Sequence, residues 1–138
     1  MTPSIPVPTP APRSIRLLIV DDNPQVRRDL RQLLTLTSEL EVTGEAGSGP
    51  EALRQADLLH PDMIFMDLGM PGMDGFEAAR QIKAAQPGCR VIAFSIHGCP
   101  LSRQKAAQAG MDGFIEKGTP LGEILETVLR VWNADESQ

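Results

Sequence analysis

The sequence predicts an α/β fold in which a five-stranded parallel sheet is covered by helices on both faces. Three observations predict it. Apolar, strand-like runs alternate with segments whose apolar residues recur at helical spacing, this alternation repeats five times, and turn residues separate the segments. At 138 residues the chain has the length of one domain and can bury an adequate core without a disulfide or metal. The expected order of elements is therefore (βα)₅.

The first repeat has a clearer strand pattern than the second. Residues Ile15 to Val20 (IRLLIV) form an apolar run that is long enough for a strand buried on both faces. A helix that packs one face on the sheet is indicated by apolar residues at helical spacing: Val26, Leu30, Leu33 and Leu34. Residues Glu41 to Ala46 predict a second, weaker strand.

The second helix has both a start and a stop signal. Ser48 can cap its amino end, and His60-Pro61 should end it because the residue before proline avoids helical φ and ψ. Its apolar face carries Ala52, Leu53, Ala56 and Leu59. The third repeat follows, with a strand from Met63 to Met66 and a helix over Phe76, Ala79 and Ile82.

The last two repeats differ in the strength of their helices. Residues Arg90 to Phe94 predict the fourth strand, and Leu101 to Ala109 a small, alanine-rich helix with a poor apolar stripe. Residues Gly113 to Ile115 predict a short fifth strand. The final helix has the clearest apolar face in the chain: Leu121, Ile124, Leu125, Val128, Leu129 and Trp132.

The ends of the chain are expected to lie outside the fold. Five of the twelve prolines fall in the first twelve residues, which favours extended, unpaired backbone. We therefore expect a disordered tail at residues 1–14, a folded domain at 15–133 and a short tail at 134–138.

Composition excludes several classes of protein. A net charge of −5 without a cluster of Lys or Arg argues against direct nucleic-acid binding. No apolar run approaches the roughly 18 residues that a membrane span requires, and no signal peptide is evident. Cys89 and Cys99 form no disulfide or zinc pattern. A cytoplasmic location is expected.

Polar residues stand where the predicted strands end. Asp21 and Asp22 follow the first strand and Asp67 follows the third, while Ser95 and Lys117 follow the fourth and fifth. In the flavodoxin-like order 2-1-3-4-5, strands one and three are neighbours about 4.8 Å apart. The three carboxylates would then crowd into one pocket, where their repulsion calls for a cation, and Mg²⁺ prefers such oxygen ligands.

The same residues suit phosphoryl transfer. A carboxylate can act as the nucleophile, and a metal ion with Lys117 can take up charge on the equatorial oxygens of the transferring group. Ser95 can donate a hydrogen bond to the phosphoryl group afterwards. No general base is evident, and this chemistry needs little proton transfer.

From about Arg16 to Trp132 the chain resembles the receiver domain of bacterial two-component systems. The resemblance rests on four segments: Asp21-Asp22 after an apolar strand, PDMIFMDLGMPGMDG around Asp67, Ser95 after RVIAF, and GMDGFIEKG around Lys117. It implies a phosphorylation-dependent signalling switch in a phosphorelay, rather than an enzyme with its own substrate.

The resemblance also implies a role for each residue. Asp67 is the phosphoacceptor, Asp22 holds Mg²⁺ directly, and Asp21 holds it mainly through water. The backbone carbonyl of Gly69 is a further metal ligand. Three residues would bind the phosphoryl group or change conformation when it is present: Ser95 as the switch hydroxyl, Lys117 as the phosphate-pairing lysine and Phe114 as the mobile aromatic.

Two departures from the family pattern bear on the switch. Gly118 stands where many receivers have a proline after the lysine, and the aromatic Phe114 has no hydroxyl. We still expect Ser95 to move towards the phosphoryl group, Phe114 to turn into the vacated space and the fourth helix to repack. Gly69, which offers no shielding side chain, and His97 are candidates for tuning the lifetime of the phosphoryl group.

Other functions and the partners stay open at this point. One alternative is a receiver-like interaction module that is not phosphorylated. The other is a Mg²⁺-dependent phosphatase of the haloacid-dehalogenase type, although Gly69 replaces the second Asp that this family needs. The implied partners are a histidine kinase or histidine phosphotransfer protein and a downstream target or a C-terminal output domain, with homodimerisation on phosphorylation undecided.

Overall fold

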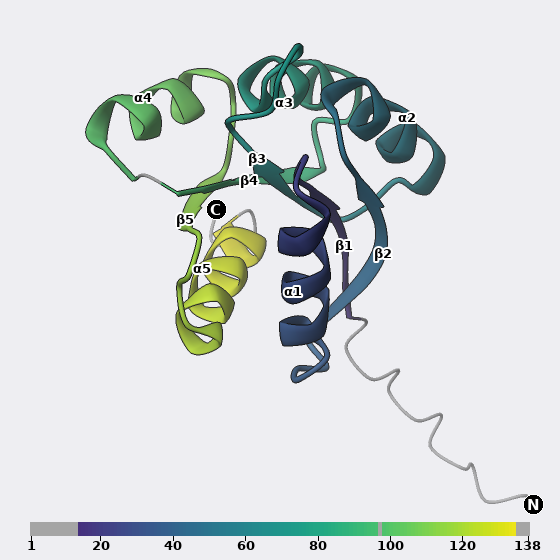
Figure 1. The fold of residues 1–138 in the computed structure, drawn as a ribbon, viewed down its shortest axis with the longest axis vertical. Helices are drawn as coiled ribbons and strands as arrows, with labels where there is room; N and C mark the ends of the chain where they lie inside the picture. The colour runs from purple at the N-terminus through teal and green to yellow at the C-terminus, as the bar shows by residue number, and fades with distance from the viewer. Residues whose placement is uncertain (1–13, 97, 135–138) are drawn as a thin grey trace, which may run out of the picture.

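The computed structural model describes residues 14–96 and 98–134. Five parallel strands form one sheet in the order β2-β1-β3-β4-β5 (Figure 1), which confirms the predicted fold. The strands are β1 (Ile15–Val20), β2 (Leu40–Ala46), β3 (Met63–Asp67), β4 (Arg90–Ser95) and β5 (Gly113–Glu116). The helices are α1 (Pro24–Leu34), α2 (Gly49–Leu59), α3 (Gly75–Ala85), α4 (Pro100–Gln108) and α5 (Leu121–Asn133).

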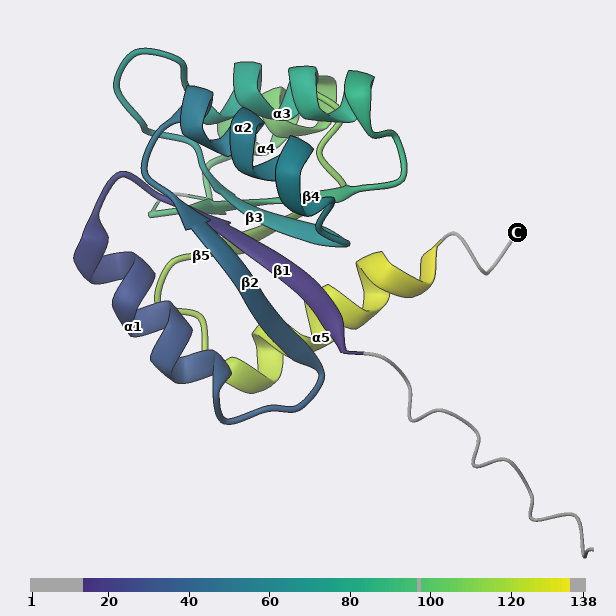
Figure 2. The same ribbon diagram turned by 90° about the vertical axis from the view of Figure 1, so that its right-hand side faces the viewer.

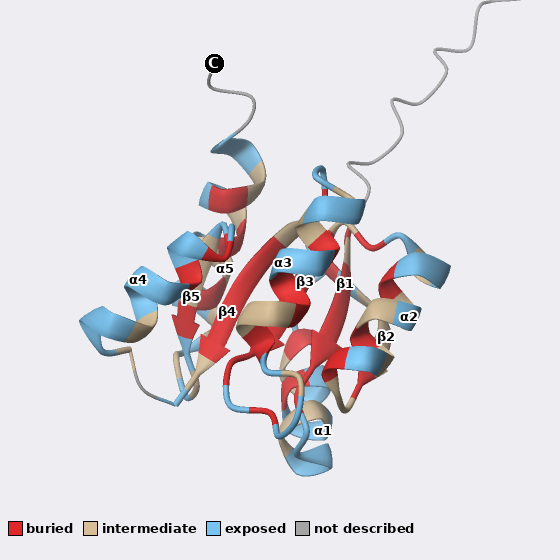
Figure 3. Cartoon of the chain, turned by 90° about the horizontal axis from the view of Figure 1, so that it is seen from above, coloured by how far each residue is buried: buried red, intermediate tan, exposed pale blue. Residues whose placement is uncertain are grey.

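The helices lie in two layers, with α2, α3 and α4 on one face of the sheet and α1 and α5 on the other (Figures 1 and 2). Side chains alternate along each strand, so the sheet contributes to a separate apolar core on each face. Ile64 and Met66 belong to the core beneath α2 and α3, whereas Met63 and Phe65 belong to the core beneath α1 and α5. Every residue of β3 is buried, so this strand is held in place from both sides (Figure 3).

The predicted elements agree with the structure, and the small differences occur at their ends. Strands β3, β4 and β5 each run one residue further than expected, and end at Asp67, Ser95 and Glu116. Helices α1 and α4 begin at Pro24 and Pro100, because proline is favoured in the first helical turn, where its missing N–H costs nothing.

The cap signals of α2 are confirmed at both ends. The Ser48 hydroxyl accepts a hydrogen bond from the Glu51 backbone N–H at 3.2 Å. The helix ends at His60, which adopts a left-handed conformation with φ of 46° and donates its N–H to the Ala56 carbonyl. This left-handed cap, rather than the restriction imposed by Pro61 alone, terminates the helix.

Helix α4 is the least anchored helix, as its poor apolar stripe predicts. It buries only Ala106 within its bounds, and its N-cap residue, Cys99, makes no side-chain capping hydrogen bond. Helix α5 instead buries Ile124, Val128 and Val131. The two helices at the β5 edge of the sheet are therefore held very differently.

Residues 1–13 and 135–138 lie outside the described residues, so the expected tails stay predictions. Within residues 14–96 and 98–134, no helix combines the length and apolar character that crossing a membrane would require.

Candidate functional site

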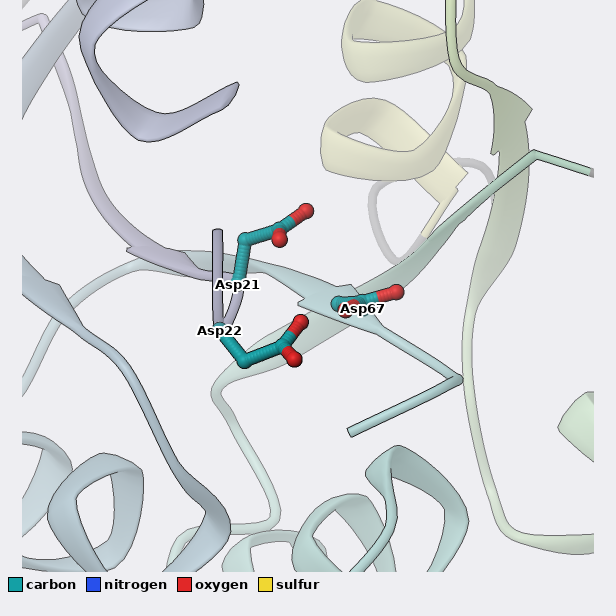
Figure 4. A group of neighbouring side chains, drawn as sticks. All are labelled: Asp21, Asp22 and Asp67. Atoms are coloured by element: carbon teal, nitrogen blue, oxygen red, sulfur yellow. The ribbon is translucent and has the colours of Figure 1, made fainter. Parts of the chain in front are cut away.

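Three carboxylates meet at the carboxyl edge of the sheet (Figure 4). Asp21 and Asp22 directly follow β1, and Asp67 is the last residue of β3, the neighbouring strand. One oxygen of each carboxylate lies within 4.8 Å of those of the other two. Asp21 and Asp67 are buried, with exposures of 1% and 6%, while Asp22 is exposed. We call this group, together with Lys117, the acidic pocket.

Asp21 has one satisfied and one unsatisfied oxygen. Its Oδ1 accepts a 2.9 Å hydrogen bond from the backbone N–H of Asn23. Its buried Oδ2 lies 2.7 Å from Lys117 Nζ, but this ion pair lacks hydrogen-bond geometry, so Oδ2 has no hydrogen-bond donor. The Lys117 ammonium group thus balances the charge of this buried oxygen.

Asp67 is held by its own turn and by Lys117. Its Oδ1 accepts hydrogen bonds from the Gly69 backbone N–H at 3.2 Å and from Lys117 Nζ at 3.3 Å. Burial raises the pKa of Asp67 above its ordinary value of 3.8, and the nearby charge of Asp21 raises this pKa further. The contacts with Gly69 and Lys117 act in the opposite direction without cancelling the rise.

Lys117 is the residue that directly follows β5, and its side chain extends into the acidic pocket. Its backbone N–H donates a 2.7 Å hydrogen bond to the Ser95 carbonyl, which fixes its position relative to the end of β4. Burial lowers the pKa of Lys117, but its pairing with Asp21 and Asp67 outweighs this effect, and the net pKa is raised above 10.5. The ammonium group is therefore charged at neutral pH.

The donor set fits a hard divalent cation. With its three carboxylates ionised and Lys117 protonated, the pocket carries a formal charge of −2. Carboxylate oxygens at this spacing, one exposed and one lacking a donor, suit Mg²⁺, which binds through one or two carboxylates and keeps several waters. Asp21, Asp22 and Asp67 are the side chains that could hold it.

The remaining predicted residues lie around the pocket. Ser95 ends β4, one position beyond Phe94, the residue paired with Asp67. Phe114 lies on β5 opposite Ala93 and packs its half-buried ring against the core beneath α2 and α3. Gly69 contacts Asp67 through its N–H, whereas His97 lies outside the described residues.

Gly118 takes a conformation that suits glycine. Its φ is +92°, a region that L side chains rarely adopt. The glycine that replaces the proline of many receivers is therefore suited to the backbone conformation of this turn.

Two residues that position the carboxylates were not predicted from the sequence. Gly75 begins α3 so close to β3 that a Cβ atom there would overlap the Asp67 carbonyl oxygen. The Asp74-Gly75 pair before a helical segment is a signal that could have indicated it. Arg27 of α1 donates a 2.7 Å hydrogen bond from Nη1 to the Asp21 carbonyl and pairs with Glu45 of β2. No local sequence signal identifies this contact, because it joins three elements.

Comparison with known proteins agrees with this geometry. The family model of the response regulator receiver domain matches residues 17–129. The response regulator GacA of Pseudomonas viridiflava is 36% identical over 118 residues, which cover 86% of this chain and 55% of GacA. The chain thus spans about half the length of the curated relatives that it matches.

Two solved structures share the fold closely. The signal receiver domain of the putative response regulator NarL from Mycobacterium tuberculosis superposes with a TM-score of 0.82 and 33% identity, covering 88% of this chain and 98% of that one. The CheX-CheY-BeF3-Mg+2 complex from Borrelia burgdorferi contains a chain with a TM-score of 0.79 and 27% identity, covering 86% of this chain and 89% of that chain. Fold, acidic pocket and family model agree, and the chain belongs to the response regulator receiver domains, the phosphorylation-dependent signalling domains of bacterial two-component systems.

Proposed function

We propose that this chain accepts a phosphoryl group on Asp67, with Mg²⁺ bound by Asp21, Asp22 and Asp67, and passes on its state through the region from Ser95 to Phe114. The observation that carries the proposal is the acidic pocket, in which three carboxylates converge and a charged lysine pairs with the two buried ones. The CheX-CheY-BeF3-Mg+2 complex from Borrelia burgdorferi, which contains a similar chain, supports the metal and the phosphoryl-like ligand.

The chemical step is a substitution at phosphorus. An oxygen of the Asp67 carboxylate forms a bond to the phosphorus atom, and the bond from phosphorus to the donor breaks. That bond is P–N when the donor is a phosphohistidine of a kinase or phosphotransfer protein, and P–O when the donor is acetyl phosphate, from which acetate leaves. The product is an acyl phosphate on Asp67.

Residues of the chain supply the charge stabilisation. Lys117 Nζ already lies 3.3 Å from Asp67 Oδ1, so its ammonium group can pair with the negatively charged phosphoryl oxygens once the group is attached there. Asp21 orients this lysine through the 2.7 Å ion pair. Mg²⁺, when bound, neutralises charge on the phosphoryl oxygens and on the carboxylates. The Gly69 carbonyl is proposed as a further ligand of that ion.

The output step begins with the new charge. Phosphorylation adds roughly −1.5 to −2 charges and several acceptor oxygens near Ser95, which draws its hydroxyl towards Asp67. We propose that Phe114 then turns into the vacated space and that α4, which buries only Ala106, repacks. The altered surface would act on a downstream protein or on an output domain of a longer chain.

Gly69 offers a route for controlling the lifetime of the phosphoryl group. A Cβ atom at this position would lie 4.0 Å from Asp67 Oδ1, so a side chain there could be accommodated beside the acyl phosphate. Gly69→Asn should slow dephosphorylation by shielding the site from water. An unchanged rate would remove Gly69 from this role.

The decisive experiment is intact-mass analysis after treatment with acetyl phosphate and Mg²⁺. The wild-type chain should gain the mass of one phosphoryl group, and Asp67→Asn or wild type in EDTA should gain none. Asp57→Asn, which alters an exposed aspartate of α2, is the matched control and should behave as wild type. An unmodified wild-type chain, or modification that persists in Asp67→Asn, would contradict the proposal.

A further inference from the structure

Arg103 of α4 joins three segments at the β5 edge of the sheet. Its guanidinium carbon lies 4.5 Å from the centroid of the Phe114 ring on β5. Its Nε donates a 3.0 Å hydrogen bond to the carbonyl of Gly98, in the loop before α4. Its Nη2 lies 3.5 Å from Glu116 Oε1, at the end of β5. One side chain therefore contacts β5 twice and this loop once.

Gly98 lies close to the ion pair of Arg103 with Glu116. A Cβ atom at Gly98 would overlap Glu116 Oε1 and would lie 3.0 Å from Arg103 Nη2. The backbone of the loop can approach the ion pair this closely because residue 98 has no side chain. Gly98, Arg103, Phe114 and Glu116 thus lie together, and we call this group the arginine clasp.

The clasp matters because α4 has few other attachments. Within its bounds the helix buries only Ala106, in contrast to the three buried apolar residues of α5. A cation over an aromatic face and an ion pair, each modest at a partly exposed site, therefore form a large share of what holds α4 against β5. The aromatic face that Arg103 covers belongs to Phe114.

We propose that Arg103 is a positioning residue that holds Phe114 and α4 in the arrangement of the unphosphorylated chain and thereby opposes switching. The inference rests on the proposed function, since it concerns the change that follows phosphorylation of Asp67. In a two-state equilibrium, a contact made in only one state lowers the population of the other. Removing the guanidinium should raise that population.

The expected effect has a definite sign and size. When the state that binds phosphoryl analogues is the minor one, the apparent affinity of an analogue rises in proportion to that state's population. Loss of a partly exposed cation–π contact should raise the population about three-fold. The concentration of beryllofluoride needed for half saturation should then fall about three-fold.

The test is a titration of the full chain with beryllofluoride in the presence of Mg²⁺, followed by the amide resonances of Gly113 and Phe114. Arg103→Met keeps the apolar stem and removes the charge, and its midpoint should lie about three-fold below that of wild type. Arg80→Met is the matched control, because Arg80 pairs with Glu77 on its own helix, and its midpoint should equal that of wild type. Glu116→Gln should shift the midpoint in the same direction by a smaller factor, since this pair is half exposed.

A second readout reports the contact directly. In the unmodified wild-type chain the side-chain protons of Arg103 should be shifted by the Phe114 ring current, and the shift should disappear at saturation. Persistence of this shift at saturation would overturn the inference, as would a midpoint for Arg103→Met that is unchanged or higher. If Arg103→Met does not fold, Arg103→Gln, which also removes the charge, serves instead, and its midpoint should lie below that of wild type.

Failure of the proposed function has a different signature. A wild-type chain whose pocket gives no saturable response to beryllofluoride would overturn both proposals. A wild-type response together with an unshifted Arg103→Met midpoint would overturn the clasp alone.

Discussion

The acidic pocket and the α4–β5 edge lie at the same end of the sheet but are built in different ways. Asp21 directly follows β1 and Asp67 ends β3, two strands whose residues are almost all buried, and α3 begins in direct contact with the Asp67 backbone. The α4–β5 edge instead combines a helix with one buried residue and a strand with one fully buried residue, Ile115. The phosphoacceptor is therefore fixed, and the region proposed to respond is loosely held.

This difference suits a switch. A nucleophile must keep its distance from the charged groups around it, which requires tight packing. A responding element must exchange between two arrangements at low cost, which requires few buried contacts.

Removing Lys117 should cause the largest loss of stability. Lys117→Met leaves Asp21 and Asp67 buried without their cation, and should lower the free energy of unfolding by about 3 kcal/mol near neutral pH, the cost of breaking a buried ion pair. The loss should shrink when Mg²⁺ is added and at acid pH, where the carboxylates are protonated. Lys105→Met, on the exposed face of α4, is the control for urea unfolding and should change little.

A methyl group at Gly75 should disturb the pocket by overpacking. Gly75→Ala forces α3 away from the Asp67 carbonyl and should cost roughly 1–3 kcal/mol, with slower phosphorylation of Asp67. Gly88→Ala is the matched control, because no atom lies within 4 Å of a Cβ atom there and its φ is not positive. Equal stabilities of the two variants would show that α3 is not tightly fitted to β3.

Asp67→Asn should stabilise the metal-free chain in a pH-dependent way. Because burial and Asp21 raise the pKa of Asp67, the folded chain binds more protons than the unfolded chain between the ordinary pKa of 3.8 and the raised value. Wild-type stability therefore falls as pH rises through this window. Asp67→Asn has no carboxylate to ionise and does not lose this stability. Above the window it should therefore be more stable than wild type by on the order of 1 kcal/mol, whereas below the window the two should be equally stable.

Magnesium should oppose this difference in stability between Asp67→Asn and wild type. At ten times its dissociation constant Mg²⁺ should stabilise wild type by about 1.4 kcal/mol and Asp67→Asn by less. Thermal unfolding of both proteins in EDTA and in Mg²⁺, at acid and at neutral pH, measures both effects. A variant that is less stable than wild type in EDTA at neutral pH would contradict the proposed repulsion.

The smallest effect should come from the α4 surface. Leu101 is 59% exposed, so Leu101→Ala should change the free energy of unfolding by less than about 0.5 kcal/mol. The weak attachment of α4 should instead be visible in hydrogen exchange, with its amides exchanging faster than those of α5. Equal protection of the two helices would remove the contrast on which the comparison rests.

Much of this architecture could be predicted from local patterns. The buried strands, the caps of α2 and the long apolar face of α5 all have signals within a few residues in sequence. The candidate carboxylates could also be predicted, because side chains at the ends of parallel strands meet at one edge of the sheet. The left-handed conformation of His60 was not predicted, since it depends on how α2 closes its final turn.

The fold, the family and the acidic residues of the pocket could all be predicted from the sequence, because hydrophobic periodicity and strand-end position are local properties. Three features could not be predicted in this way: the ion pair of Asp21 with Lys117, the close approach of the chain at Gly75 and the contact of Arg103 with Phe114. These contacts join residues distant in sequence, and their geometry depends on how helices pack on the sheet. Burial and close approach emerge only when all the elements are assembled.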